Sequence, residues 1–592
     1  MKQFFGAFFG SIIGILITGI VTTLIIIASL MGAVKGSVGK GKGETYKPSE
    51  NSILKLDLDV DIKERGYQNP FGDLDLGPLM PKSVIGLNDI ISNLQKAKTD
   101  KNIQGIYLEA GNPMVGFASL EEIRNALIDF KQSGKFIYSY SEGYSQKGYY
   151  IASVATKVFL NPQGGFEMKG LSSQIMFFKN MLEKLQIEVQ IFRHGKFKSA
   201  IEPFMLDKMS EANRAQVETY LGSIWNHLIK GISQQRKIST DSINDIANNL
   251  LIKTPEDAVN FHLVDELKYE DEVMASIKKE LKLTEKEKIS IASFDDYINA
   301  ASSEKAPFDN KIAVIYAVGE IVSGKGGGDK MGSYEIAKAI KEARLNDEIK
   351  AIVLRVNSPG GSALASDVIW RETILAQKTK PLIVSMGDVA ASGGYYISCG
   401  ADRIFAQPNT ITGSIGVFGM IPNAQKALSE KLGITIDTVN TNKHSDVGTI
   451  LRGAVGIEYD YIQQSVERIY DVFITKVAQG RKMQKLSIDS IGQGRVWSGV
   501  DALKIKLVDE IGGIEKATAY AAKMAKISSY SVESYPKQKD PIQELLGNSK
   551  DEVSTRVLKT NLGDQYIYLK QLQNVLHTKG IQARVPYEMI IE

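Results

Sequence analysis

Two glycine-rich loops in the second half of the sequence carry residues that could perform chemistry. The first, NSPGG, covers residues 357–361, and the second, AASGGYY, covers residues 390–396. Each follows an apolar run and precedes a helical pattern. Paired glycines permit backbone conformations that other residues avoid, so such loops can expose N–H groups. Together the loops could supply a nucleophile, Ser392, and backbone donors that stabilise an oxyanion.

A purely structural role for both loops is the simpler alternative. A serine at a strand-to-helix junction is most often an N-cap residue, and paired glycines often form only a turn. A nucleophilic serine also needs a base. His194 and His444 show no accompanying acid pattern, and neither lies in a G-x-S-x-G context. A Ser–His–Asp triad is therefore disfavoured.

The chain contains an internal duplication, which bears on the question of the base. The stretch SEGYSQKGYYIASVATKVFLNP (141–162) resembles GDVAASGGYYISCGADRIFAQP (387–408). Further on, EKLQIEVQIFRHGK (183–196) resembles EKLGITIDTVNTNK (430–443). Across these and two later pairs the offset stays between 244 and 247. A constant offset over more than about 100 residues indicates two tandem copies of one domain.

The two copies differ at the positions that could do chemistry. Gln146 of the earlier copy stands where the later copy has Ser392. Conversely, the earlier copy has Lys198 where the later one has His444 or Ser445. A lysine can act as a base if burial lowers its pKa. Two half-sites that share one active site would explain both differences; the alternative is that Lys198 is an ordinary surface lysine.

Short apolar runs alternate with helical periodicity in the later copy. The runs at 311–318, 350–356 and 380–387 predict buried strands, and the patterns at 333–345 and 362–377 predict amphipathic helices. Strand and helix alternating at this spacing predict an α/β domain with mostly parallel pairing.

The N-terminus predicts a membrane anchor. Residues 4–34 are 31 consecutive residues without a charge, and about 20 apolar residues suffice to span a bilayer. We therefore expect a transmembrane signal anchor over residues 1–34, with a cleaved signal peptide as the alternative. The other expected segments are a flexible tether (35–50), the first repeat (51–300), a linker (301–310), the second repeat (311–535) and a C-terminal tail (536–592).

Composition excludes several classes of function. The net charge of +3 with 23% charged residues gives no electrostatic argument for nucleic acid. Five histidines and one cysteine, Cys399, form no metal-ligand cluster, so we expect no metal, no cofactor and no nucleic-acid partner. More lysines follow the apolar span (Lys35, Lys40 and Lys42) than precede it (Lys2). By itself, this excess of positive charge on the C-terminal side predicts a cytoplasmic location for the domains that follow.

The motifs NSPGG, AASGGYYIS, TGSIGVFG and GKFKSAIEPF together resemble the long, duplicated form of signal peptide peptidase A. This family consists of membrane-anchored Ser–Lys proteases with a ClpP/crotonase-like fold. The resemblance covers nearly the whole chain and implies tandem ClpP/crotonase-like α/β domains behind an N-terminal transmembrane helix. It implies hydrolysis of cleaved signal peptides and similar apolar peptides by a homotetramer. It also implies catalytic domains outside the bacterial cytoplasmic membrane, against the lysine count.

The resemblance implies a role for each candidate residue. It assigns Ser392 as the nucleophile, Lys198 as the general base contributed by the earlier repeat, Ser414 as the residue that orients the lysine, and the N–H groups of Gly361 and Gly393 as the oxyanion hole. Lys196 is the local rival for the base. The competing interpretations are a ClpP-like membrane protease with another substrate, a crotonase-type acyl-CoA enzyme and a non-catalytic membrane scaffold.

Overall fold

The computed structural model describes residues 18–19, 46–67, 84–298, 300, 309–327, 330–538, 558, 563, 566 and 580–585. Most of the expected anchor, tether, linker and C-terminal tail lies outside these ranges. Within them, no helix combines the length and the apolar character needed to cross a membrane.

The N-terminal repeat is built on a parallel sheet with the strand order β8-β6-β5-β4-β1-β9. Its strands are β1 (Ser52–Asp57), β4 (Ile103–Glu109), β5 (Phe136–Tyr144), β6 (Lys157–Phe166), β8 (Glu266–Leu267) and β9 (Ile291–Ala292). Side chains alternate between two cores along each strand: Ile106 and Leu108 join one, and Tyr107 joins the other. Burial on both faces explains why apolar residues follow one another directly within these strands, as in Ile106–Leu108 of β4.

Helices cover both faces of this sheet. The first core lies under α2 (Leu87–Thr99), α3 (Phe117–Lys131), α4 (Gln146–Ala152), α7 (Glu211–Arg236) and α8 (Thr240–Asn248), and the second lies under α10 (Glu270–Glu280). The shorter elements are β2 (Ile62–Lys63), β3 (Ile85–Gly86), α5 (Lys179–Lys184), β7 (Glu188–Arg193), α6 (Glu202–Met205), α9 (Pro255–Asn260) and α11 (Phe294–Ile298).

The C-terminal repeat has a sheet with the matching order β20-β16-β15-β13-β10-β21, again parallel. Its strands are β10 (Lys311–Val318), β13 (Ile349–Ser358), β15 (Leu382–Ala391), β16 (Arg403–Ala406), β20 (Glu510–Ile511) and β21 (Ser531–Tyr535). In addition, β17 (Ile411–Gly413) pairs parallel with β15, and β19 (Val496–Ser498) pairs antiparallel with β17. The equal strand order confirms the duplication that the sequence offset predicts.

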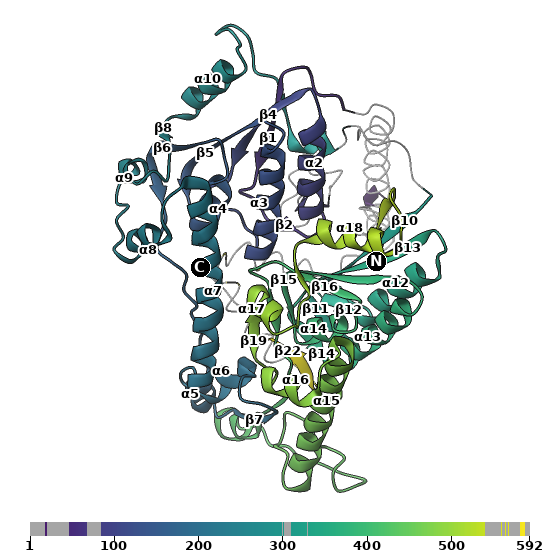
Figure 1. Cartoon of the computed structure of the whole chain (residues 1–592). Helices are drawn as coiled ribbons and strands as arrows, with labels where there is room; N and C mark the ends of the chain where they lie inside the picture. The colour runs from purple at the N-terminus through teal and green to yellow at the C-terminus, as the bar shows by residue number, and fades with distance from the viewer. Residues whose placement is uncertain are drawn as a thin grey trace, which may run out of the picture.

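The helices of the C-terminal repeat also lie on both faces, with α12 and α13 on one side of β10 and β13 and α18 on the other (Figure 1). They are α12 (Ser333–Leu345), α13 (Ala363–Gln377), α14 (Gly393–Ser398), α15 (Ile457–Arg481), α16 (Lys485–Ile491), α17 (Gly499–Lys504) and α18 (Ile514–Met524). The strand expected at 311–318 and the helix expected at 333–345 have the predicted bounds. The other three predicted elements are also present, with shifted ends.

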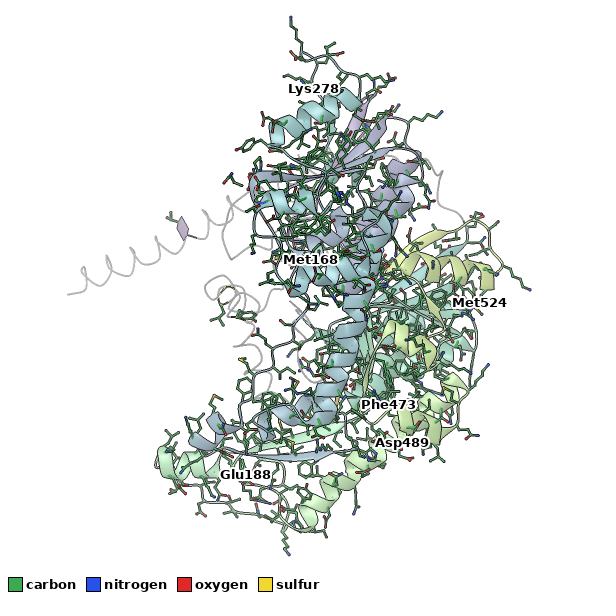
Figure 2. The ribbon with its side chains drawn as sticks, turned by 60° about the vertical axis from the view of Figure 1, so that its left-hand side comes forward. Met168, Glu188, Lys278, Phe473, Asp489 and Met524 are labelled. Atoms are coloured by element: carbon green, nitrogen blue, oxygen red, sulfur yellow. The ribbon has the colours of Figure 1, made fainter. Side chains whose placement is uncertain are left out.

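A third sheet joins the two repeats. Its order is β12-β11-β14-β22-β18-β7, formed by β11 (Glu320–Val322), β12 (Lys330–Gly332), β14 (Gly360–Ser362), β18 (Phe418–Asn423), β22 (Gln582–Arg584) and β7. Only β7 comes from the N-terminal repeat, and it pairs antiparallel with β18. Figure 2 shows Glu188, at the start of β7, near the lower end of the molecule, at about the level of Asp489 and well below Met168 of the N-terminal repeat. The segment of the N-terminal repeat that contains β7 therefore packs against the C-terminal repeat, at β18.

Two features hold the repeats in this arrangement. The long helix α7, of 26 residues, runs from the level of α4 down to α6 (Figure 1). Asp388 of β15 caps α3 across the domain boundary, because its carboxylate accepts hydrogen bonds from the Ala118 and Ser119 N–H groups and from the Ser119 hydroxyl. An acidic cap at a helix N-terminus is favourable.

Candidate active site

Ser392 lies between β15 and α14 in a backbone conformation unusual for a serine. Its φ is +55° and its ψ is −111°, a combination that costs of order 1–3 kcal/mol and persists only where neighbours impose it. Here the Ser392 N–H donates to the Gly413 carbonyl at 2.8 Å. The Ser392 side chain makes no N-cap hydrogen bond, which removes the simple capping interpretation and leaves Oγ free for another partner.

That partner is Lys198. Its Nζ lies 2.8 Å from Ser392 Oγ, across 194 positions of sequence. Both side chains are 0% exposed. Burial lowers the pKa of Lys198 well below its usual range, because a low-polarity surrounding disfavours the charged ammonium. A non-catalytic scaffold would not need these two side chains to meet, and their hydrogen-bond distance therefore argues against it.

Ser414 completes the surroundings of the lysine. Lys198 Nζ donates to Ser414 Oγ at 3.1 Å and to the Ser414 carbonyl at 3.3 Å. Ser392 Oγ also lies 3.3 Å from the Gly416 carbonyl, to which it donates. The contacts with Ser414 hold Lys198 Nζ in the position from which it reaches Ser392 Oγ. Lys196, the alternative candidate for the base, is exposed, whereas Lys198 is buried.

A short segment of the C-terminal repeat holds the lysine loop in place. The Gln493 carbonyl accepts from the Phe197 N–H, and the Arg495 carbonyl accepts from the Ser414 N–H. Between them, a Cβ on Gly494 would lie 2.6 Å from Lys198 N, and Gly494 has φ +84°. Only glycine fits this approach.

Gln216 is a site residue that the sequence did not reveal. It lies on α7 with 2% exposure, and its Nε2 donates to Phe197 O and Ser199 Oγ, on either side of Lys198. Its Oε1 accepts from the Val496 N–H of β19. One buried amide thus ties the lysine loop of one repeat to the other repeat. A lone glutamine in a helical pattern carries no signal of such a role.

The two glycine loops meet beside Ser392. A Cβ built on Gly360 would lie 2.7 Å from Gly393 N, so the loops touch at the N-terminus of α14. Gly361 is paired with Ala583 of β22. The ladder bonds Ala363 N–H to Ile581 O and Val585 N–H to Pro359 O are four residues apart along each strand, and the Gly361–Ala583 pair lies midway between them. Because hydrogen-bonded pairs recur every second residue in an antiparallel ladder, the Gly361 N–H points towards Ala583.

Gln146 has a structural task in the N-terminal repeat. Its Oε1 accepts from the Lys169 and Gly170 N–H groups, both at 2.8 Å, and its Nε2 donates to Gly170 O. The preceding Ser145 caps α4 with its side chain. At the position equivalent to Ser392, the N-terminal repeat therefore has a side chain that hydrogen-bonds the backbone of the loop at 169–170.

Both histidines have a carboxylate partner in the structure, although no acid pattern accompanies them in the sequence. His194 Nδ1 lies 2.5 Å from Glu467 Oε2, and His444 Nδ1 lies 2.7 Å from Glu458 Oε1. Both carboxylates come from α15, more than ten residues away, so no local pattern could reveal them. Neither histidine contacts Ser392 in the part of the chain that the structure describes.

Comparison with known proteins places this chain in a family. The family model "Peptidase family S49" matches twice, at residues 129–284 and 374–528. "Protease 4" of Haemophilus influenzae is 34% identical over 88% of this chain and 87% of its own length. "Protease 4" of Salmonella typhi is 39% identical over 76% of this chain and 74% of its own. "Serine protease SPPA, chloroplastic" of Arabidopsis thaliana is 32% identical over 85% and 74%.

A buried serine 2.8 Å from a buried lysine with a lowered pKa, on a duplicated α/β scaffold with such relatives, defines the chain as a serine protease. The two matched segments lie one in each repeat, as a tandem duplication requires. The chain belongs to peptidase family S49, and the resemblance to the long, duplicated signal peptide peptidase A is confirmed.

Proposed function

We propose that the chain hydrolyses peptides with a Ser392–Lys198 dyad shared between the two repeats. The observation that carries the proposal is the 2.8 Å distance between Lys198 Nζ and Ser392 Oγ in a fully buried setting. Neutral Lys198 accepts the Ser392 proton, and Oγ attacks the scissile carbonyl carbon. The resulting lysinium protonates the leaving amine, and water then hydrolyses the acyl-enzyme by the same relay.

The remaining site residues have supporting roles. Ser414 orients Lys198 by accepting hydrogen bonds from Nζ. The N–H groups of Gly361 and Gly393 stabilise the tetrahedral oxyanion, a contribution that typically lowers the barrier by a few kcal/mol. The close contact of the two glycine loops supports this assignment.

The substrates we propose are cleaved signal peptides and similar apolar peptides, in keeping with the relative named "Putative signal peptide peptidase SppA" of Enterococcus faecium. We further propose a ClpP/crotonase-like fold for each repeat and a homotetramer. A single-pass anchor over residues 4–34 would hold the catalytic domains on the outer face of the bacterial cytoplasmic membrane. The uncharged length of that segment supports the anchor.

The pH dependence of hydrolysis tests the proposed base. Only neutral Lys198 can accept the serine proton, so activity is lost as pH falls through the folded-state pKa of Lys198. Because burial holds that pKa well below 10.5, kcat/KM for a small apolar peptide ester should rise with a slope of about 1 and level off well below pH 10.5. Tryptophan fluorescence over the same range shows that the chain stays folded. An acid optimum would identify a different base.

A further inference from the structure

Lys198 lies at the centre of a tight backbone turn. Its φ is −75° and its ψ is 75°, and the Ser199 N–H donates to the Phe197 carbonyl at 2.8 Å. These values describe an inverse γ-turn. In such a turn the direction of the central side chain depends on the carbonyl before it and on the residue after it. Whatever binds Phe197 O and Ser199 therefore helps to fix where Lys198 Nζ lies.

The side-chain amide of Gln216 binds both sides of this turn. Its Nε2 lies 3.3 Å from Phe197 O and 3.0 Å from Ser199 Oγ, to which it donates. Its Oε1 accepts from the Val496 N–H at 3.2 Å. The two ends of an amide have the same shape, so only its partners decide its orientation. In the opposite orientation, oxygen would face the Phe197 carbonyl and N–H would face the Val496 N–H.

The orientation of Gln216 also affects Ser392. Val496 of β19 pairs with Gly413 of β17, and the Gly413 carbonyl accepts from the Ser392 N–H at 2.8 Å. One end of the Gln216 side chain therefore contacts the turn that carries the base. The other end contacts the strand pair that holds the backbone of the nucleophile. A reversed amide would displace the two members of the dyad relative to each other.

Asn213, one helical turn earlier on α7, leaves Gln216 a single favourable orientation. Asn213 Oδ1 accepts from Gln216 Nε2 at 3.0 Å, so the N–H end of Gln216 must face it. Asn213 is itself an amide and is 0% exposed. Its two ends also have the same shape, so its own orientation depends on a further partner.

That partner is Glu202, at the start of α6. Glu202 is 1% exposed, and its Oε2 accepts from Asn213 Nδ2 at 2.8 Å and from the Ser210 N–H at 3.2 Å. Its Oε1 accepts from the Ser210 hydroxyl. An ionised carboxylate can only accept hydrogen bonds. Asn213 must therefore turn its nitrogen towards Glu202 and its oxygen towards Gln216.

The C-terminal repeat has a different side chain at the position of Gln216. The helices α7 and α15 both end at a lysine with positive φ, Lys237 and Lys482, so they correspond at an offset of 482 − 237, or 245. This offset relates Gln216 to Tyr461, whose side chain is 68% exposed. The buried amide therefore accompanies the repeat that supplies the lysine and is not a general requirement of the fold.

We propose that Glu202 and Asn213 are positioning residues for the dyad. The Glu202 carboxylate sets the orientation of the Asn213 amide, and Asn213 in turn sets the orientation of Gln216. In that orientation, Gln216 holds Lys198 and Ser392 at the distance at which the proton can pass between them. This role rests on the proposed hydrolysis, whereas the orientation of the amides does not.

Asn213→Asp tests the proposal, because it keeps the shape of the side chain and removes the donor that faces Glu202. Two adjacent carboxylates repel each other, so the arrangement that orients Gln216 is lost. At about pH 8, kcat for a small apolar peptide ester should fall about 10²-fold with KM changed less than about twofold, because a misplaced catalytic group costs rate and not binding. Asn226→Asp makes the same change at an exposed position of α7 and should match the wild type.

Adding Glu202→Gln to Asn213→Asp should restore activity. The new amide at position 202 can donate to the new carboxylate at position 213, so Gln216 keeps its orientation and the net charge of the wild type is restored. Glu202→Gln alone should cost little, because its amide oxygen can still accept from Asn213. We expect kcat of the double variant to be at least about tenfold above that of Asn213→Asp. Recovery should be incomplete, because the Ser210 N–H loses its acceptor.

Denaturant unfolding tests the orientation of the amides without hydrolysis. At about pH 8, Asn213→Asp should unfold at a lower denaturant concentration than the double variant. This deficit should shrink as pH falls and one carboxylate of the pair becomes protonated, because the protonated group can donate again. If Asn213→Asp does not fold at about pH 8, the double variant should still fold there.

Three results would overturn the proposal. One is a double variant that is neither more active nor more stable than Asn213→Asp. Another is an Asn213→Asp variant that keeps the kcat of Asn226→Asp. The third is a double variant that regains stability without regaining kcat, which would make the network purely structural. Inactivity of the wild-type chain towards the ester would instead refute the proposed hydrolysis, and the unfolding comparison would still decide the orientation of the amides.

Discussion

Ser392→Ala and Lys198→Met should each lower kcat/KM for a small apolar peptide ester by about 10⁴-fold or more. Removing Oγ eliminates the nucleophile. Replacing Lys198 with methionine keeps an unbranched side chain in the buried space but removes the only base within reach of Oγ among the described residues. The double variant should be no worse than either single one, because the two groups act as one unit.

Lys196→Met is the matched control for the lysine. It removes the same charge two residues away, at an exposed position, and should leave the hydrolysis rate nearly unchanged. Sedimentation of all variants checks that assembly is preserved. Full activity of either dyad variant would refute the dyad, and loss of activity only in Lys196→Met would move the base to that residue.

Arg355→Met should destabilise the junction of the two repeats by about 3–5 kcal/mol, because it leaves two buried carboxylates uncompensated. Arg355 is 0% exposed; its Nε lies 2.9 Å from Glu64 Oε2, and its Nη1 lies 2.7 Å from Glu122 Oε1. Burial raises the pKa of Glu122, opposed by Arg355. The variant should therefore recover part of its stability as pH falls and the Glu122 carboxylate becomes protonated.

The control for this prediction is another ion pair of the same chemistry. Arg344 lies 3.4 Å from Glu372, with both side chains about one fifth exposed, so Arg344→Met should cost no more than about 1 kcal/mol. Denaturant unfolding at several pH values measures both. If the two variants lose equal stability, or if the Arg355→Met deficit does not shrink at low pH, the buried carboxylates are not the cause.

Much of the fold was predictable because local patterns encode it. The apolar run at 311–318 and the helical period at 333–345 gave elements with the expected bounds. These patterns depend on neighbouring residues alone, so the sequence carries them in full. The constant offset predicted the duplication, and the shared strand order confirmed it.

The copies also show where local pattern fails. Residues 188–193 and 435–440 follow the same kind of turn, yet only the first form a strand. The difference is the presence of β18 as a hydrogen-bonding partner. A strand needs a neighbour, and the sequence of one stretch does not say which neighbour it meets.

The sequence by itself determined the parts of the site: a serine in a glycine loop of one repeat, and a lysine in a distinctive motif of the other. Only the tertiary structure decided that these parts meet. The 2.8 Å approach of Lys198 to Ser392 depends on β7 pairing with β18, on Gln216 tying the lysine loop to β19 and on Gly494 leaving room for it. Burial, which lowers the lysine pKa, likewise exists only once both repeats have closed around it.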